Sequence, residues 1–235
     1  NMRLVLYIVQ GGASFLGLAL VPPFYWWRTT RTSLVTFVNH PRISLVDIAL
    51  VVAIVIVFIG FNSIFIEWNA SVDLPGTSGF ESWARDTEDK ATELTKFLTE
   101  FSSVGQFIVG FVVIALFAGI SEEFVLRGLL QPALNRATGN IHVAIWVSAI
   151  LFSALHMQFF GFIPRVLLGA LFGYLYFWSG NLLIPIFAHV VNNGFSVVMI
   201  YLNQKELAGV DLENPEAAPW PVAIVCTLLT AVLLY

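Results

Sequence analysis

Long apolar runs constrain the fold of this chain more than any other feature of its sequence. Stretches of about 20 apolar residues recur from end to end, and an α-helix of that length crosses about 30 Å of hydrocarbon. Only 11% of the 235 residues are charged, whereas a soluble domain carries about 25%. We therefore predict an all-α fold, a polytopic bundle of about seven to eight transmembrane helices. The visible spans comprise residues 4–27, 43–66, 101–131, 141–160, 163–179, 182–203 and 219–235.

The predicted organisation is one transmembrane domain over residues 1–235, with a motif-bearing core at about 101–203. Residues 67–100 are rich in acidic residues and in Pro, Gly, Ser and Thr. We expect them to form a polar extramembrane linker, in which the charged stretch 85–96 could form a surface helix; a solvated connector is the preferred interpretation. A net charge of −4 without a basic stripe argues against nucleic acid as a partner. We expect an integral, multi-pass protein of a prokaryotic plasma membrane, and the sequence leaves its oligomeric state open.

Ionisable residues at membrane depth are the most informative ones, because a charge near the bilayer centre costs about 3 kcal/mol or more. Glu122 and Glu123 directly follow the apolar run 101–120 without a helix-breaking signal. Glu123 and Arg127 are spaced i and i+4, which favours an ion pair, whereas Glu122 points about 100° away from that face. Glu122 is then the candidate general base. Both glutamates could instead be structural, and we prefer that interpretation for Glu123 only.

Two further polar clusters lie on later apolar runs. Phe152 and His156 are spaced i and i+4, and His189 and Asn193 have the same spacing, so each pair shares one helix face. Asn192 is an alternative to Asn193. Polar groups buried in hydrocarbon must find partners, so we expect the three clusters to face one another around a polar intramembrane cavity.

A carboxylate, two imidazoles and an amide can together hydrolyse an amide bond. Glu122 would draw a proton from water, while the other groups orient that water or bind the oxyanion that forms. The alternative is a divalent metal site, with zinc held by Glu122, His156 and His189, because two histidines and a carboxylate form a catalytic zinc set. The sequence does not choose between these two mechanisms, and it indicates no other cofactor.

These residues resemble the motifs of the CPBP intramembrane proteases, the CAAX protease and bacteriocin-processing (Abi) family that includes the Rce1-like enzymes. The family pattern is Glu-Glu-x-x-x-Arg, Phe-x-x-x-His and His-x-x-x-Asn on three helices, and all three motifs occur here in that order. The resemblance implies an intramembrane endopeptidase, glutamate-type or metalloprotease, that cuts a membrane-associated protein or peptide. It implies catalytic roles for Glu122, His156, His189 and Asn193, and structural or orienting roles for Glu123, Arg127 and Phe152.

Two functions from other classes stay open at this stage. The first is a non-catalytic membrane scaffold or immunity protein of the same fold. The second is a transporter or proton relay, because buried glutamates and histidines also line ion paths. Intact motifs argue against the scaffold, and the lack of an internal repeat argues against the transporter.

The depth of the three clusters presents a geometric difficulty. Counted along the predicted spans, Glu122 and His189 fall nearer one side of the membrane, and His156 falls nearer the other. We therefore expect either that the run 141–160 is offset or bent, or that a span is miscounted. Gly161 and Pro164 would permit a break in the helix.

Overall fold

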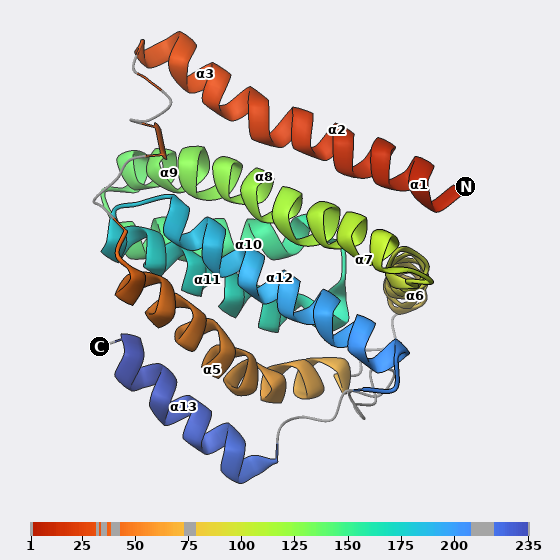
Figure 1. The fold of residues 1–235 in the computed structure, drawn as a ribbon. Coiled ribbons are helices and arrows are strands. Elements are labelled where there is room, and N and C mark those ends of the chain that lie inside the picture. The colour runs from red at the N-terminus through yellow and green to blue at the C-terminus, as the bar shows by residue number, and fades with distance from the viewer. Residues whose placement is uncertain are drawn as a thin grey trace.

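The computed structural model describes residues 2–31, 33, 37–38, 43–72, 79–207 and 219–234 (Figure 1). All regular structure in these ranges is helical, which confirms the predicted all-α class. Five helical stretches are long and apolar enough to cross a membrane: Met2–Thr30, Leu45–Ala70, Val104–Thr138, Phe159–Ser179 and Leu183–Gln204. The predicted spans 141–160 and 219–235 correspond instead to shorter helices of 15 residues each.

Two of the long helices contain π-helical turns, and each of these two helices is given one name. The N-terminal helix consists of α1 (Met2–Leu6), η1 (Tyr7–Gly11), α2 (Gly12–Ser14), η2 (Phe15–Leu20) and α3 (Val21–Thr30). The motif helix consists of α7 (Val104–Phe111), η3 (Val112–Phe117), α8 (Ala118–Val125), η4 (Leu126–Leu130) and α9 (Gln131–Thr138). A π turn shifts the faces that the following residues present, and such turns are frequent at functional sites.

The other helices are uninterrupted. They are α5 (Leu45–Ala70), α6 (Phe80–Thr99), α10 (Ile141–Leu155), α11 (Phe162–Ser179), α12 (Leu183–Gln204) and α13 (Trp220–Leu234), and a single 3-10 turn, η5 (Phe159–Gly161), precedes α11. Helix α6 falls inside the predicted linker 67–100. Its 20 residues extend the suggested surface helix 85–96 at both ends.

Figure 1 shows the helices as successive layers. The N-terminal helix lies along one edge against the motif helix, and α10, α11 and α12 fill the middle. Helix α5 packs on α11 and α12, and α13 covers α5 at the opposite edge. Val55, Phe172 and Ala188 are fully buried where α5, α11 and α12 meet. The helices that carry the three predicted motifs are therefore central.

The motif helix and α10 form an antiparallel hairpin, and its geometry resolves the depth difficulty. The predicted span 101–131 is too short, because the helix continues to Thr138 and turns at Gly139, whose φ of 65° suits glycine. Helix α10 then ends at Leu155, earlier than predicted and before Gly161. Glu122 precedes Gly139 by 139 − 122 = 17 residues, and His156 follows it by 156 − 139 = 17 residues. The two residues therefore lie at the same depth.

Side-chain amides of α5 hold the connection between α10 and α11. Asn69 accepts a hydrogen bond from the backbone N–H of Ile163 (2.8 Å) and donates one to the carbonyl of Phe159 (3.1 Å). Asn62, seven residues earlier, donates to the carbonyl of Pro164 (3.0 Å). The first N–H groups of a helix lack partners within that helix, so Asn69 satisfies a group that would be costly to bury alone.

Close packing of α11 depends on two glycines four residues apart. A Cβ atom at Gly169 would approach Ala149 of α10 within 3.2 Å, and one at Gly173 would approach Ile145 within 2.8 Å. The absence of side chains lets α10 and α11 lie close together. It also exposes two carbonyl groups to the motif helix, where Gln131 donates to the carbonyl of Gly173 (3.1 Å).

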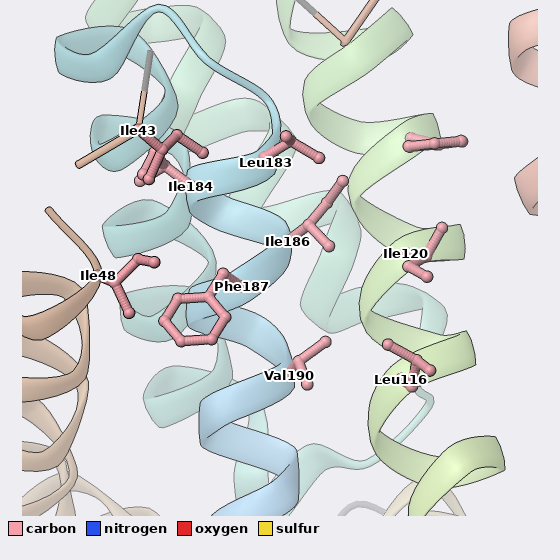
Figure 2. A pocket seen from close by; sticks show the side chains of 10 residues that line it. Ile43, Ile48, Leu116, Ile120, Leu183, Ile184, Ile186, Phe187 and Val190 are labelled. Atoms are coloured by element: carbon pink, nitrogen blue, oxygen red, sulfur yellow. The ribbon is translucent and has the colours of Figure 1, made fainter. Parts of the chain in front are cut away.

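An apolar hollow of about 380 Å³ opens between α5, α12 and the motif helix (Figure 2). Figure 2 shows Ile48 on one side, Phe187 and Val190 on α12, and Leu116 and Ile120 facing them from the motif helix. Its lining residues within the described part of the chain are all apolar, so they offer no group for acid–base chemistry.

Replacing Asn69 by alanine should destabilise the protein, because the Ile163 N–H and the Phe159 carbonyl would lose their partner. The expected loss is about 1–3 kcal/mol for each buried group left unsatisfied. The thermal unfolding midpoint in detergent measures it, with Ser71→Ala as the control, since Ser71 is exposed and bonds only within its own turn. An unchanged midpoint in Asn69→Ala would show that the connection is held by packing alone.

Candidate active site

A buried ion pair lies at the centre of the site. Arg127 Nη1 donates to Glu123 Oε1 at 2.7 Å, and both side chains are 0% exposed. Arg127 Nη2 donates to the carbonyl of Gly169 on α11, and the guanidinium carbon lies 5.6 Å from the ring centres of Phe152 and Phe172. Charges removed from water require such partners. The ion pair predicted from the i, i+4 spacing is present.

His189 joins this pair from α12. Its Nδ1 donates to the same oxygen, Glu123 Oε1, at 2.8 Å, and its ring stacks on Phe172 with ring centres 4.9 Å apart. Because Nδ1 carries the proton in that hydrogen bond, the ring orientation is fixed and Nε2 points away from Glu123. Nε2 lies 3.7 Å from Glu122 Oε2. His189 is thus bonded to Glu123 and lies beside Glu122.

Glu122 differs from Glu123 in its surroundings. Its side chain is 27% exposed, whereas that of Glu123 is fully buried. Its Oε2 atom is buried beside His189 and has no hydrogen-bond partner among the described residues. One side of the carboxylate, at Oε2, therefore faces His189, and its accessible part faces a cavity. This is the arrangement that a general base needs to reach water or substrate.

The cavity that Glu122 borders has a volume of about 360 Å³ and lies between the N-terminal helix, α6 and the motif-bearing helices. Its lining residues are Leu6, Tyr7, Gly11, Ser14, Leu18, Thr95, Leu98, Val113, Ile114, Phe117, Ala118, Ser121, Glu122, His156 and Asn193. A smaller hollow of about 230 Å³ adjoins it and shares Glu122 and His156. One residue of each predicted motif thus faces the same space.

His156 is the first residue beyond α10. Its Nδ1 atom donates to the carbonyl of Phe152 at 2.8 Å, and its ring packs edge-on to the Phe152 ring at 4.9 Å between centres. Nδ1 carries the proton in that hydrogen bond, so Nε2 of the neutral ring is an acceptor. His156 can accordingly accept a hydrogen bond from a water molecule in the cavity.

Asn193 rather than Asn192 lines the cavity. Asn193 Nδ2 donates to the carbonyl of Ile114 at 3.3 Å, and Asn193 Oδ1 accepts from Asn192 Nδ2 at 3.1 Å. Asn192 therefore orients its neighbour. Since an amide nitrogen has two hydrogens, Asn193 keeps one donor that is not used by these contacts.

The donors of the predicted zinc set do not converge as placed. Across the part of the chain that is described, no three His, Cys, Asp or Glu side chains form a group that could hold a metal ion. His189 directs Nδ1 to Glu123, and His156 directs Nδ1 to a carbonyl, so each offers only Nε2. A zinc-binding histidine commonly donates its other ring N–H in this way, so the zinc set of Glu122, His156 and His189 stays a prediction.

Several residues of the site were not singled out from the sequence. Gln131, four residues after Arg127, could have been found because it continues the same helix face into a buried contact. Asn62 and Asn69 carry a similar signal, since they are polar residues seven apart near an apolar run.

Comparisons with known proteins agree with the geometry. Residues 104–195 match the family model described as type II CAAX prenyl endopeptidase, Rce1-like. The chain is 32% identical over 100 residues to the membrane-embedded CAAX protease MroQ of Staphylococcus aureus, covering 40% of either chain. It is 30% identical over 84 residues to YpbD of Bacillus subtilis, which is 34% of this chain and 40% of YpbD.

A plant protein is similar to the same degree. CAAX prenyl protease 2 of Arabidopsis thaliana is 29% identical over 112 residues, which cover 38% of this chain and 35% of the plant protein. The chain therefore matches well under half the length of these relatives. No solved structure matches it. Relatives from bacteria and a plant leave the predicted prokaryotic origin untested.

Glu123→Gln should destabilise the protein strongly, because Arg127 would keep its charge in a dry interior without a carboxylate. Removing one partner of a buried ion pair costs about 3–5 kcal/mol. The thermal midpoint in detergent measures the effect, and Glu93→Gln, the same change on the exposed face of α6, is the control. The double variant Glu123→Leu with Arg127→Met should recover part of the loss. A midpoint equal to wild type for Glu123→Gln would contradict the account.

Proposed function

We propose that this multi-pass membrane protein is an intramembrane endopeptidase, because residues 104–195 match the family model of Rce1-like CAAX prenyl endopeptidases. Its reaction is the hydrolysis of a peptide bond in a membrane-associated protein or peptide. The observation that carries the proposal is the cavity shared by Glu122, His156 and Asn193, with the Glu123–Arg127–His189 network directly behind it.

Glu122 acts as the base in the proposed mechanism. It takes a proton from a water molecule in the cavity, and the hydroxide equivalent forms a bond to the carbonyl carbon of the scissile peptide. His156 Nε2 accepts the second hydrogen of that water and so orients it. The protonated Glu122 then gives its proton to the amide nitrogen as the C–N bond breaks, which leaves a new carboxyl group and a new amine.

The oxyanion that forms during attack requires a donor. Asn193 is suited to this role, because it lines the cavity and has one amide hydrogen that its contact with Ile114 does not use. Loss of one such donor typically slows catalysis by about 10²–10³-fold. His189 packs behind Glu122, with its Nε2 3.7 Å from Glu122 Oε2, and bounds that side of the site.

The charges around Glu122 support a division of roles between the two glutamates. Glu123 already accepts hydrogen bonds from Arg127 and His189 through one oxygen, and its side chain has no exposed surface. It is therefore unsuited to receive a proton from water in the cavity. Glu122 is accessible, and its partner His189 lies beyond hydrogen-bond distance.

The first experiment compares wild type and Glu122→Gln in detergent and in vesicles, with prenylated and unprenylated membrane peptides as substrates. Removal of the base should lower the rate of cleavage by about 10²–10⁴-fold, because glutamine keeps the shape but cannot take the proton. A strong chelator should leave wild-type cleavage unchanged, since no metal ligand is part of the mechanism. Comparison of the two peptide classes identifies whether a prenyl group is required.

Two controls make the result interpretable. Equal thermal midpoints for wild type and Glu122→Gln show that the variant is folded, and Glu93→Gln on the exposed face of α6 should cleave as wild type. Cleavage lost on chelation would replace the glutamate mechanism with a metal-dependent one. Equal cleavage by wild type and Glu122→Gln would refute the assignment of the base, and a biological activity retained without cleavage would favour a scaffold.

A further inference from the structure

Helix α6 lies outside the predicted spans, yet it is bonded to the turn that follows His156. Glu88 Oε1 accepts a hydrogen bond from Gln158 Nε2 at 3.0 Å, and Glu88 Oε2 accepts one from the backbone N–H of Phe160 at 3.3 Å. One carboxylate thus holds two residues of the segment between α10 and α11. A carboxylate on a helix that is only a solvated linker is hydrated by water and makes no such contacts.

Gln158 extends this contact toward the interior. Its Oε1 accepts a hydrogen bond from the Arg165 cation at Nη2 (2.8 Å), and its Nε2 donates one to the Glu88 carboxylate. A chain of polar groups therefore runs from Glu88 on the surface helix through Gln158 to Arg165 of α11.

Aromatic contacts reinforce the docking of α6. The rings of Phe80 and Trp83 each lie 5.4 Å from the ring of Phe159, and the guanidinium of Arg85 lies 4.7 Å from the ring centre of Phe160. Cation–π and ring contacts of this kind add to the stability of packed helices. The first half of α6 is therefore fixed on the turn.

The second half of α6 closes one side of the cavity. Thr95 and Leu98 are among the lining residues, and the carbonyl of Leu98 accepts a hydrogen bond from Tyr7 of the N-terminal helix. Gln204 of α12 donates to the carbonyl of Thr99 at 2.9 Å. Helix α6 is thus held at both ends, over the turn and beside Glu122.

His156 lies where α10 passes into the turn, at the first residue beyond the helix. Its ring donates to the Phe152 carbonyl and its backbone N–H to the Ser153 carbonyl (3.2 Å), and the next residue, Met157, has a φ of 55°. A residue at such a junction moves with the segment that follows it. That segment is fixed by Asn69 from α5 and by Glu88 from α6.

We propose that Glu88 is a positioning residue of the active site, which holds His156 at the cavity through Gln158 and Phe160. The docked helix α6 is then part of the catalytic structure and not a passive linker. The kinetic consequence of this inference rests on the proposed peptidase function. Its structural content, that Glu88 controls the position of His156, does not rest on that function.

The kinetic test uses Glu88→Ala, Glu88→Gln and the matched control Glu93→Ala, whose residue is exposed on the same helix. A misplaced catalytic group of this kind costs about 10²-fold. Glu88→Ala should therefore lower kcat by about 10–100-fold with KM little changed, and Glu88→Gln, which keeps one acceptor, should restore part of it. A change in KM alone, or equal losses in Glu88→Ala and Glu93→Ala, would overturn the proposal.

A second measurement does not depend on activity. Diethyl pyrocarbonate modifies accessible histidines, and mass spectrometry reports the rate at His156, with the exposed His142 on α10 as an internal reference. The ratio of the His156 rate to the His142 rate should rise several-fold in Glu88→Ala and stay constant in Glu93→Ala. An unchanged ratio in Glu88→Ala refutes the positioning role. A raised ratio supports it even if wild type cleaves no peptide, an outcome that would count against the peptidase proposal only.

Discussion

The buried ion pair between Glu123 and Arg127 is the interaction on which the rest of the site depends. One oxygen of Glu123 accepts hydrogen bonds from Arg127 and from His189, so it fixes the contact between the motif helix and α12. Arg127 in turn reaches a carbonyl of α11 at Gly169 and lies between two phenylalanine rings. Four helices therefore meet around one pair of opposite charges. Because neither charge has access to water, the pair is stable only in this complete arrangement, which leaves the neighbouring Glu122 in a defined position.

The hairpin between the motif helix and α10 determines what Glu122 meets. Equal distances along the chain from Gly139 bring Glu122 and His156 to one depth, and the early end of α10 lets His156 face the cavity instead of continuing to the membrane surface. A short helix inside a bundle leaves backbone groups to be satisfied, and polar side chains of α5 and α6 supply the partners. The same contacts that complete the fold at this point thus support the proposed catalytic histidine.

Much of this arrangement could be predicted from the sequence, for physical reasons. Apolar length marks the spans, and the cost of charge in hydrocarbon singles out Glu122, Glu123 and Arg127, whose i, i+4 spacing predicts the observed pair. Helix ends were harder, since the apolar runs overshoot or undershoot the helices: the motif helix continues past its apolar run to Thr138, and α10 stops at Leu155 inside its run. The docking of α6 could not be foreseen, because Glu88 gains its partners from residues about 70 positions away in the chain.

The most direct test of the central claim, that Glu122 activates water, is a single-turnover cleavage in water enriched in oxygen-18. Mass spectrometry of the products and of the peptide that contains Glu122 then locates the label. The account predicts one labelled oxygen in the new carboxyl group and none in Glu122, because water attacks the substrate directly. Label in the carboxylate of Glu122 would contradict it, since that result requires a covalent intermediate in which the glutamate itself is the nucleophile.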